Sequence, residues 1–302
     1  MSPGGRTDAA LLRRVLTTIE GGREPPSEDG RSPSAPRAGL VGRVAAALAP
    51  TPGLAVPQPR LSLARAFDPA LGGGLAGDGL HEIVPAAPVD GAAAMAFALA
   101  LAAGFLARRS SAALAIGESF GALEGGALYA PGLVAHGLPS SRVVFVAAPD
   151  ALAALWAMEE ALKCGAPAAV VGEIWSLRPY GLSASRRLLL AARKGRTPAF
   201  LVLPRAAGRT ERLSTAADAR FEIAAAPSRR QRSAADRDLP GAFACAARLT
   251  KTRLAGRGEA FDAARVVRLE WRSEERTFGD PAISLPLAAD PEHRPRAAAP
   301  WR

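Results

Sequence analysis

The residue run that comes nearest to a chemical site is a loop of the kind that binds nucleotide phosphates. A strand, a loop and a helix N-terminus together hold phosphate well, because free backbone N–H groups and the helix dipole both favour an anion there. The motif G-x-x-x-x-G-K-[ST] adds a lysine for the β- and γ-phosphates and a hydroxyl for Mg²⁺. In the best register, its four key positions are occupied by Ala86, Gly91, Ala92 and Ala93. Only the second glycine is kept, so the sequence predicts a degenerate loop, no nucleotide cofactor and no ATP hydrolysis.

Two carboxylates stand where an ATPase carries its water-activating and metal-binding acids, near the ends of predicted strands. Glu118 follows the apolar run 112–116, and Glu173 follows the run 168–171. Without the lysine and the hydroxyl, these remnant acids cannot hold a triphosphate. The simpler interpretation of each is a solvated carboxylate at a strand end or a partner for an arginine.

Cations concentrate between residues 228 and 257 and form a candidate surface for nucleic acid. The members of this cluster chosen as partner contacts are Arg229, Arg230, Arg232, Lys251, Arg253 and Arg257. Phosphate contacts from such a cluster give sequence-independent, salt-sensitive DNA affinity. Phe243 is the only aromatic residue in the stretch, so base stacking has little support. An acidic protein partner and a solvated basic loop stay open as alternatives.

Three aromatic side chains are further candidates for contacts. Trp301 lies in a Pro-rich terminus with few packing options, which favours a contact with a partner. Trp175 and Tyr180 flank a loop that follows a predicted strand. For this pair we expect packing in the core or at its rim.

Composition favours helices packed on a sheet. Hydrophobic residues make up 49% of the chain but aromatic residues only 5%, which argues against an all-β sandwich. The longest uncharged apolar run, 91–107, is dominated by alanine and falls short of the ~20 residues that span a bilayer. Residues 1–20 contain no apolar core with a cleavage motif. We therefore expect a cytoplasmic protein with no membrane partner.

The net charge and the cysteine and histidine usage limit the function further. The formal charge is +10 and the sequence pI is about 10.9, which indicates an acidic partner or, equally, a GC-rich genome. Cys164 and Cys245 are too few for a disulfide framework, so both are expected to be reduced. The histidines, His81, His136 and His293, lie far apart without a ligand at metal-binding spacing. No metal site is predicted.

The elements that must position these residues alternate between strand and helix. The expected strands are 81–84, 112–116, 143–146, 168–174 and 199–203. One long Ala-rich helix is expected to begin at Asp90, and three further helices are expected at 128–136, 150–162 and 184–194. Asp90, Asp150 and Ser183 are the expected N-caps, and Gly165 is placed as a helix C-terminal glycine. This alternation predicts an α/β fold with a mainly parallel sheet flanked by helices.

The chain divides into three parts. Residues 1–60 are expected to hold a short amphipathic helix and a Pro/Gly-rich linker, and residues 61–276 the α/β domain. From about residue 205, strands at 221–223, 245–251 and 266–271 predict a basic antiparallel β extension toward the C-terminus. Residues 277–302 are expected to form a Pro-rich tail.

Several segments resemble one family of proteins. They are LYAPGLVAHGL at 128–138, LWAMEEAL at 155–162, VVGEI at 170–174, RLTKTRLAGRG at 248–258, VRLEW at 267–271 and SLPL at 284–287. With the Gly-rich turn at 71–79 and the order of elements, they are similar to the ImuA family, RecA-like proteins of SOS mutagenesis. The resemblance covers roughly residues 61–287, and the run from 128 to 174 is its most specific part.

This resemblance implies a RecA-like core and a function. It implies a non-catalytic accessory factor of damage-induced, error-prone translesion DNA synthesis, which bridges an ImuB-like protein and an error-prone polymerase III-type α subunit. RecA is a further candidate partner, and DNA is another through the basic cluster. The alternatives are a SulA-like inhibitor of cell division, which shares the fold, and a RecA-type DNA-binding NTPase.

Overall fold

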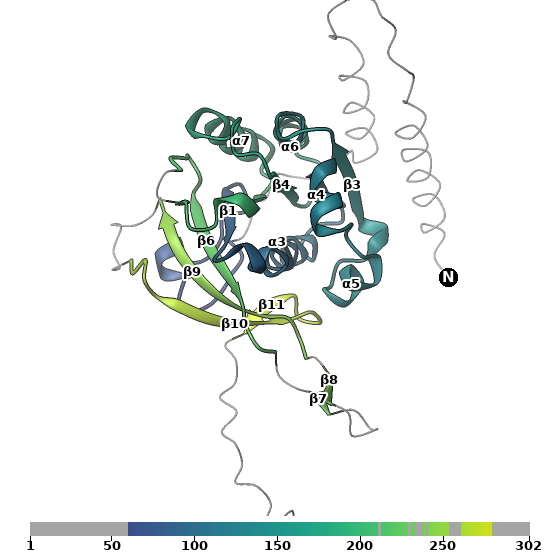
Figure 1. The fold of residues 1–302 in the computed structure, drawn as a ribbon, viewed down its shortest axis with the longest axis vertical. Helices are drawn as coiled ribbons and strands as arrows, with labels where there is room; N and C mark the ends of the chain where they lie inside the picture. Colours follow the sequence, from purple (N-terminus) through teal and green to yellow (C-terminus); the bar gives the residue numbers. More distant parts are fainter. Residues whose placement is uncertain are drawn as a thin grey trace, which may run out of the picture.

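A single nine-stranded sheet organises the described part of the protein (Figure 1). The computed structural model describes residues 60–210, 213–228, 241–253 and 261–279, and the backbone of 231–232 and 238–239. The strand order is β11-β10-β9-β6-β1-β5-β4-β2-β3. Strand β1 is therefore central, with β5 and β6 as its neighbours.

The sheet consists of a parallel half and an antiparallel extension. The parallel strands are β1 (Leu80–Pro85), β2 (Ala113–Glu118), β3 (Val143–Ala148), β4 (Val170–Glu173), β5 (Ala199–Val202) and β6 (Ala219–Ala225). The antiparallel strands are β9 (Ala244–Thr252), β10 (Val266–Arg272) and β11 (Thr277–Gly279). The short strands β7 (Gln231–Arg232) and β8 (Asp238–Leu239) pair separately. The expected α/β class, with its antiparallel β extension, is confirmed.

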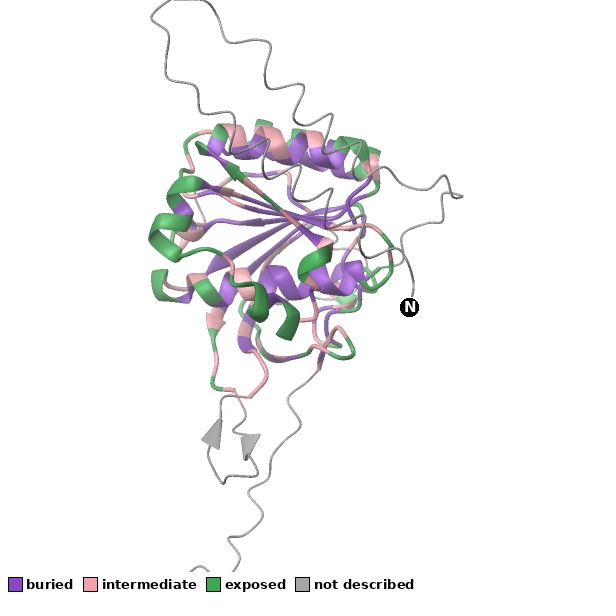
Figure 2. Ribbon diagram, turned by 90° about the vertical axis from the view of Figure 1, so that its right-hand side faces the viewer, coloured by how far each residue is buried: buried purple, intermediate pink, exposed green. Residues whose placement is uncertain are grey.

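Helices cover both faces of the sheet (Figure 2). They are α3 (Gly91–Leu106), α4 (Ser119–Gly125), α5 (Ala130–Ala135), α6 (Ala151–Cys164) and α7 (Leu182–Gly195), with 3₁₀ turns at η1 (Pro69–Leu71), η2 (Pro88–Asp90), η3 (Ser140–Arg142) and η4 (Pro204–Ala206). The core on one face contains α3 with Ile83, Phe200 and Phe221. The core on the other face contains α6 and α7.

Helix α3 is the central helix of the first core. The stretch Pro88–Leu106 is apolar and long enough to cross a bilayer, but 61% of it is buried inside the protein. Phe97 and Leu101 are among the largest fully buried side chains. Its uniform apolar character follows from packing against the sheet on one side and against β11 and the segment before β1 on the other.

The ends of α6 and α7 show why specific residues occur there. Asp150 caps α6, since its Oδ1 accepts from the Ala153 backbone N–H at 2.7 Å. Gly165 ends that helix at φ 68°, in the left-handed region, as predicted. Helix α7 ends against it so closely that a Cβ on Gly195 would lie 1.8 Å from the Leu162 carbonyl oxygen. The two helices therefore meet through glycine at this end.

Four expectations about the elements need correction. Helix α4 was not expected, and α5 is shorter than the expected 128–136. Helix α7 begins two residues early and Gly181 occupies its N-cap position, so Ser183 lies inside the helix and does not cap it. The sheet continues through β11 to Gly279, past the expected domain end at residue 276. The predicted N-terminal helix and linker lie outside the described residues.

Candidate functional site

The loop between β1 and α3 occupies the position expected for a phosphate-binding loop, at the carboxyl end of the central strand. Asp90 stands at the N-cap position of α3, but its side chain makes no bond to the helix. Its Oδ2 accepts from the Ala87 backbone N–H at 3.0 Å, and its Oδ1 accepts from the Ala225 backbone N–H at 2.8 Å. The expected side-chain cap is therefore wrong: this buried carboxylate ties the loop to the end of β6.

Most of the other backbone donors of this loop are also used within the protein. The N–H groups of Ala86, Asp90 and Gly91 all donate to backbone carbonyl oxygens. Ala87 donates to the Asp90 carboxylate, and Pro88 has no N–H to offer. A phosphate needs these donors free. The loop is thus closed by its own hydrogen bonds, and a negative side chain sits near the helix N-terminus.

The two positions that carry the lysine and the hydroxyl in the motif hold methyl groups in different surroundings. Ala92 is exposed at the start of α3, whereas Ala93 is buried in the core. Gly91 has a helical φ of −54°, which any residue adopts. The retained glycine therefore has no conformational requirement here.

Glu118 is not solvated, and no arginine among the described residues pairs with it, so neither expected interpretation holds there. It is buried, with 7% exposure, at the end of β2. Its Oε1 accepts from the backbone N–H groups of Trp175 at 2.5 Å and Ser176 at 3.2 Å. Through this one oxygen, the carboxylate holds the turn that follows β4.

Glu173 lies beside Glu118 at the end of β4. Burial raises the pKa of Glu173 and the Glu118 charge adds to this shift, whereas the Trp175 indole acts in the opposite direction.

The Trp175 ring meets Phe120 edge-on, with 5.8 Å between the ring centroids, and lies under the Arg205 guanidinium. Trp175 therefore packs at the rim of the sheet, as predicted. No group of His, Cys, Asp and Glu suited to a metal ion occurs among the described residues.

A buried ion pair lies on the α6 and α7 side of the sheet, and the sequence reasoning missed it. Glu82 and Arg220 are direct neighbours on the parallel strands β1 and β6, so their side chains share a face. Arg220 Nε donates to Glu82 Oε2 at 2.7 Å, and the Tyr180 hydroxyl donates to Oε1 at 2.5 Å. Burial and the Glu82 charge raise the pKa of Tyr180 well above its usual value. The only signal for this cluster was a glutamate within an apolar strand.

Arg220 also secures the chain that leads into β6. Its Nη1 donates to the Thr210 carbonyl at 3.0 Å, and its Nη2 donates to the Leu213 carbonyl at 2.9 Å. The same Nη2 reaches the Thr215 hydroxyl at 3.1 Å. The guanidinium therefore fixes the connection between β5 and β6 to the central strand.

The predicted basic cluster is only partly described. Arg229, Arg230, Arg257 and Trp301 lie outside the described residues, and for Arg232 only the backbone in β7 is described. The roles expected for these residues stay predictions.

The two described members of the cluster lie at the end of β9. Lys251 is half-buried, and burial lowers its pKa. Its Nζ donates to the carbonyl and the hydroxyl of Thr215, so the ammonium is engaged inside the protein. Arg253 is half-exposed and faces Asp218, with 3.9 Å between Nε and Oδ1. Of these two cations, Arg253 has the more accessible side chain.

Comparisons with known proteins identify the family. No family model matches the sequence. The ImuA proteins of two Caulobacter vibrioides strains, NA1000 / CB15N and ATCC 19089 / CIP 103742 / CB 15, are each 35% identical over 188 residues, which span 59% of this chain and 71% of the relative.

Two solved structures are more distant. The RadB recombinase aligns with a TM-score of 0.43 and 17% identity over 72% of this chain and 97% of that chain. SulA from Pseudomonas aeruginosa aligns with a TM-score of 0.33 and 20% identity over 41% of this chain and 97% of that chain. These low scores carry no functional argument. The 35% identity over 71% of the Caulobacter protein, in contrast, shows that this chain belongs to the ImuA family.

Proposed function

We propose that this chain is a non-catalytic accessory factor of damage-induced, error-prone translesion DNA synthesis. In this role it bridges an ImuB-like protein and an error-prone polymerase III-type α subunit in the cytoplasm. Membership of the ImuA family supports the accessory role in general terms. The named partners follow from the resemblance of segments such as 128–138 and 155–162 to that family.

The closed loop between β1 and α3 is the observation that carries the proposal. The N–H groups of Ala86, Ala87, Asp90 and Gly91 are used by backbone carbonyls and by the Asp90 carboxylate, and no lysine stands at position 92. A triphosphate would have to displace these bonds and approach a buried negative charge. An accessory factor that acts by binding other macromolecules has no need of a loop that holds ATP.

Nucleotide turnover is tested directly. Steady-state phosphate release with Mg-ATP should equal that of a blank, and calorimetry should detect no Mg-ATP binding, with or without single-stranded DNA. Glu118→Gln serves as the matched variant, because it keeps an acceptor for the Trp175 and Ser176 N–H groups. Phosphate release above the blank that this variant abolishes would contradict the proposal.

The partners are tested by affinity capture of the tagged full chain from cells after DNA damage. The ImuB-like protein and the error-prone polymerase should be enriched over undamaged cells and over an untagged control, and RecA is the third candidate. Enrichment of the cytoskeletal division GTPase without these proteins would instead support the SulA-like alternative.

DNA binding is tested by removing three clustered cations. The Arg229→Ala/Arg230→Ala/Arg232→Ala variant should bind single-stranded DNA more weakly at every sequence, with a salt slope reduced by about one for each arginine that contacts phosphate. The matched control removes three exposed arginines from other elements, Arg65, Arg186 and Arg265. Equal losses in both variants would mean that only the overall charge matters, and unchanged affinity in the first would reject the cluster as a DNA site.

A further inference from the structure

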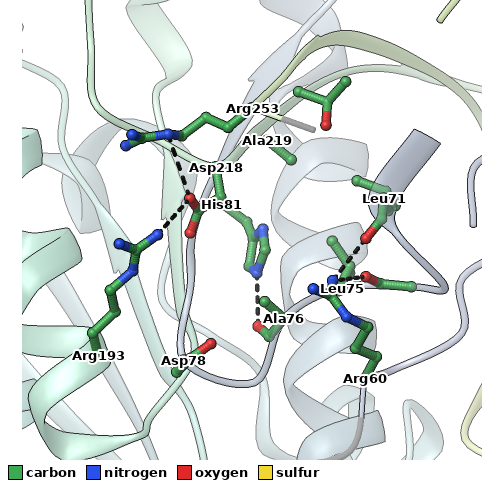
Figure 3. Close-up of a pocket in the computed structure, with 12 residues that line it drawn as sticks. Arg60, Leu71, Leu75, Ala76, Asp78, His81, Arg193, Asp218, Ala219 and Arg253 are labelled. Atoms are coloured by element: carbon green, nitrogen blue, oxygen red, sulfur yellow. Dashed lines mark hydrogen bonds and ion pairs between the residues drawn. The ribbon is translucent and has the colours of Figure 1, made fainter. Parts of the chain in front are cut away.

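A cavity of about 370 Å³ opens at the edge of the sheet opposite the closed loop (Figure 3). It lies where β1 and β6 begin, whereas the loop at Ala86 follows the end of β1. Its lining combines charged side chains with an apolar part formed by Leu71 and Leu75. The volume falls within the range of small-molecule sites, and neither the family relationship nor the degenerate loop accounts for this cavity.

His81 lines this cavity and carries a buried ring nitrogen with no hydrogen-bond partner among the described residues. The residue is 1% exposed, and its Nε2 lies 3.0 Å from the Ala76 carbonyl oxygen. Because a carbonyl only accepts, we assign the ring hydrogen to Nε2, which leaves a lone pair on Nδ1. That atom is buried and has no hydrogen-bond partner among the described residues. A ligand hydroxyl or N–H would satisfy it.

Burial favours the neutral form of His81, in which Nδ1 can only accept. Burial lowers the pKa of His81, although Asp218 and Asp78 act in the opposite direction, and Arg60 adds to the lowering. The ring also stacks on Phe200, with 5.6 Å between centroids. An anion with only acceptor oxygens therefore finds no donor at Nδ1.

Two arginines on one side of the cavity share a single carboxylate oxygen. Arg193 Nη2 lies 3.3 Å and Arg253 Nε 3.9 Å from Asp218 Oδ1. Both arginine side chains are about half exposed, at 51% and 49%. Figure 3 shows His81 between this group and the side of the cavity that carries Arg60 and Leu75. The cavity lining carries three guanidinium groups, of Arg60, Arg193 and Arg253, against the carboxylates of Asp78 and Asp218, so one positive charge remains.

The two features together define the ligand class. A monocarboxylate would bring only what Asp218 already supplies, whereas a phosphomonoester carries about −1.5 to −2 charges at pH 7 and suits paired guanidinium donors. A DNA phosphodiester carries a single charge and has no donor for His81. We propose that the cavity binds a small hydroxylated phosphomonoester, with its phosphoryl oxygens on Arg193 and Arg253 and a ligand hydroxyl donating to His81 Nδ1.

The test is calorimetry of the full chain with ribose 5-phosphate. Binding is expected, and Arg193→Gln and Arg253→Gln should each weaken it at least about tenfold, in line with the loss of a charge-assisted hydrogen bond. The matched control is Arg186→Gln, an exposed arginine on the same helix α7 that does not line the cavity. It should leave the affinity unchanged.

The role of His81 is tested first from the ligand side, where no core residue has to change. Methyl phosphate keeps the phosphomonoester but lacks sugar hydroxyls, and it should bind at least about tenfold more weakly than ribose 5-phosphate. Unphosphorylated ribose should not bind, and sulfate, which also lacks a hydroxyl donor, should bind no more tightly than methyl phosphate. His81→Phe should remove the preference for ribose 5-phosphate over methyl phosphate.

The outcomes that overturn the proposal are equally defined. They are absence of ribose 5-phosphate binding up to about 10 mM, equal binding of ribose or sulfate, equal affinity for methyl phosphate, and insensitivity to both arginine variants. The proposed accessory function does not depend on this cavity, so a negative result here leaves that function unaffected.

Discussion

Glu82 and Arg220 form an ion pair inside the core, and this pair makes single residues decisive for stability. Both side chains are almost inaccessible, at 0% and 6% exposure. Removing one partner leaves a buried charge unpaired, which costs about 3–5 kcal/mol. Arg220→Met is therefore expected to lower the free energy of unfolding by that amount, measured by urea denaturation.

The companion variants separate the charge from the packing. Glu82→Gln combined with Arg220→Met removes both charges and should recover part of the loss. Tyr180→Phe removes a hydrogen bond to a carboxylate and should cost about 1.5–3 kcal/mol. If Arg220→Met cost no more than Arg186→Met, an exposed site on α7, the ion pair would have no special role.

Glu173 gives a pH-dependent prediction at the same scale. Burial raises its pKa in the folded protein, and Glu118 contributes. Folding then favours the neutral acid, so stability falls as pH rises from the unfolded pKa of about 4.3 through the raised folded pKa. Glu173→Gln should raise the thermal midpoint at pH 7 and have no such effect at about pH 3, below both pKa values.

An exposed glutamate provides the control for Glu173. Glu275, whose side chain is 59% exposed, pairs with Arg272 alone among the described residues, so Glu275→Gln should shift the midpoint little at either pH. If the thermal midpoint of the Glu173→Gln variant is unchanged or lower at pH 7, the ionised Glu173 carboxylate does not destabilise the folded protein.

At the scale of elements, the expected lack of nucleotide binding by the β1–α3 loop depends on its hydrogen-bonded backbone as much as on the missing lysine. Ala92 is exposed, so Ala92→Lys should fold normally and return the cation to its motif position. We nevertheless expect no Mg-ATP binding by calorimetry, because the loop donors stay bonded and Pro88 supplies none. Micromolar binding by this variant would show that the lysine alone was limiting.

The contact between α6 and β4 is a second element-scale case. A Cβ on Gly172 would lie 2.1 Å from Met158 Sδ, so Gly172→Ala overpacks the core and should cost about 1–3 kcal/mol in chemical denaturation. Gly117 on the adjacent strand β2 is the matched control, since a Cβ there meets nothing within 4 Å. Met158→Ala combined with Gly172→Ala should relieve the overlap. Equal costs for the two alanine substitutions would exclude close packing as the cause.

Across the whole molecule, local sequence patterns predicted the helices and strands. Contacts between residues far apart in the sequence could not be predicted in this way. The apolar runs of the parallel strands and the cap at Asp150 depend on neighbouring residues, and both are confirmed. Glu82 and Arg220 are 138 residues apart, so only the sheet order brings them together. Asp90 bonds to Ala225 from 135 residues away, which is why it looked like a simple helix cap.

The end of the domain is the last feature that depends on the whole molecule. Sequence composition places it at residue 276, but Phe278 in β11 packs on Phe97 and Trp271, with ring centroids 5.2 Å and 4.9 Å away. A chain that ends at Arg276 loses this buried ring and should be less stable than one that ends at Gly279, by about 3–5 kcal/mol. Phe278→Ala in the full chain should reproduce most of that difference. Equal unfolding midpoints for the two truncated chains would mean that the sheet is complete without β11, and that composition located the boundary better than packing does.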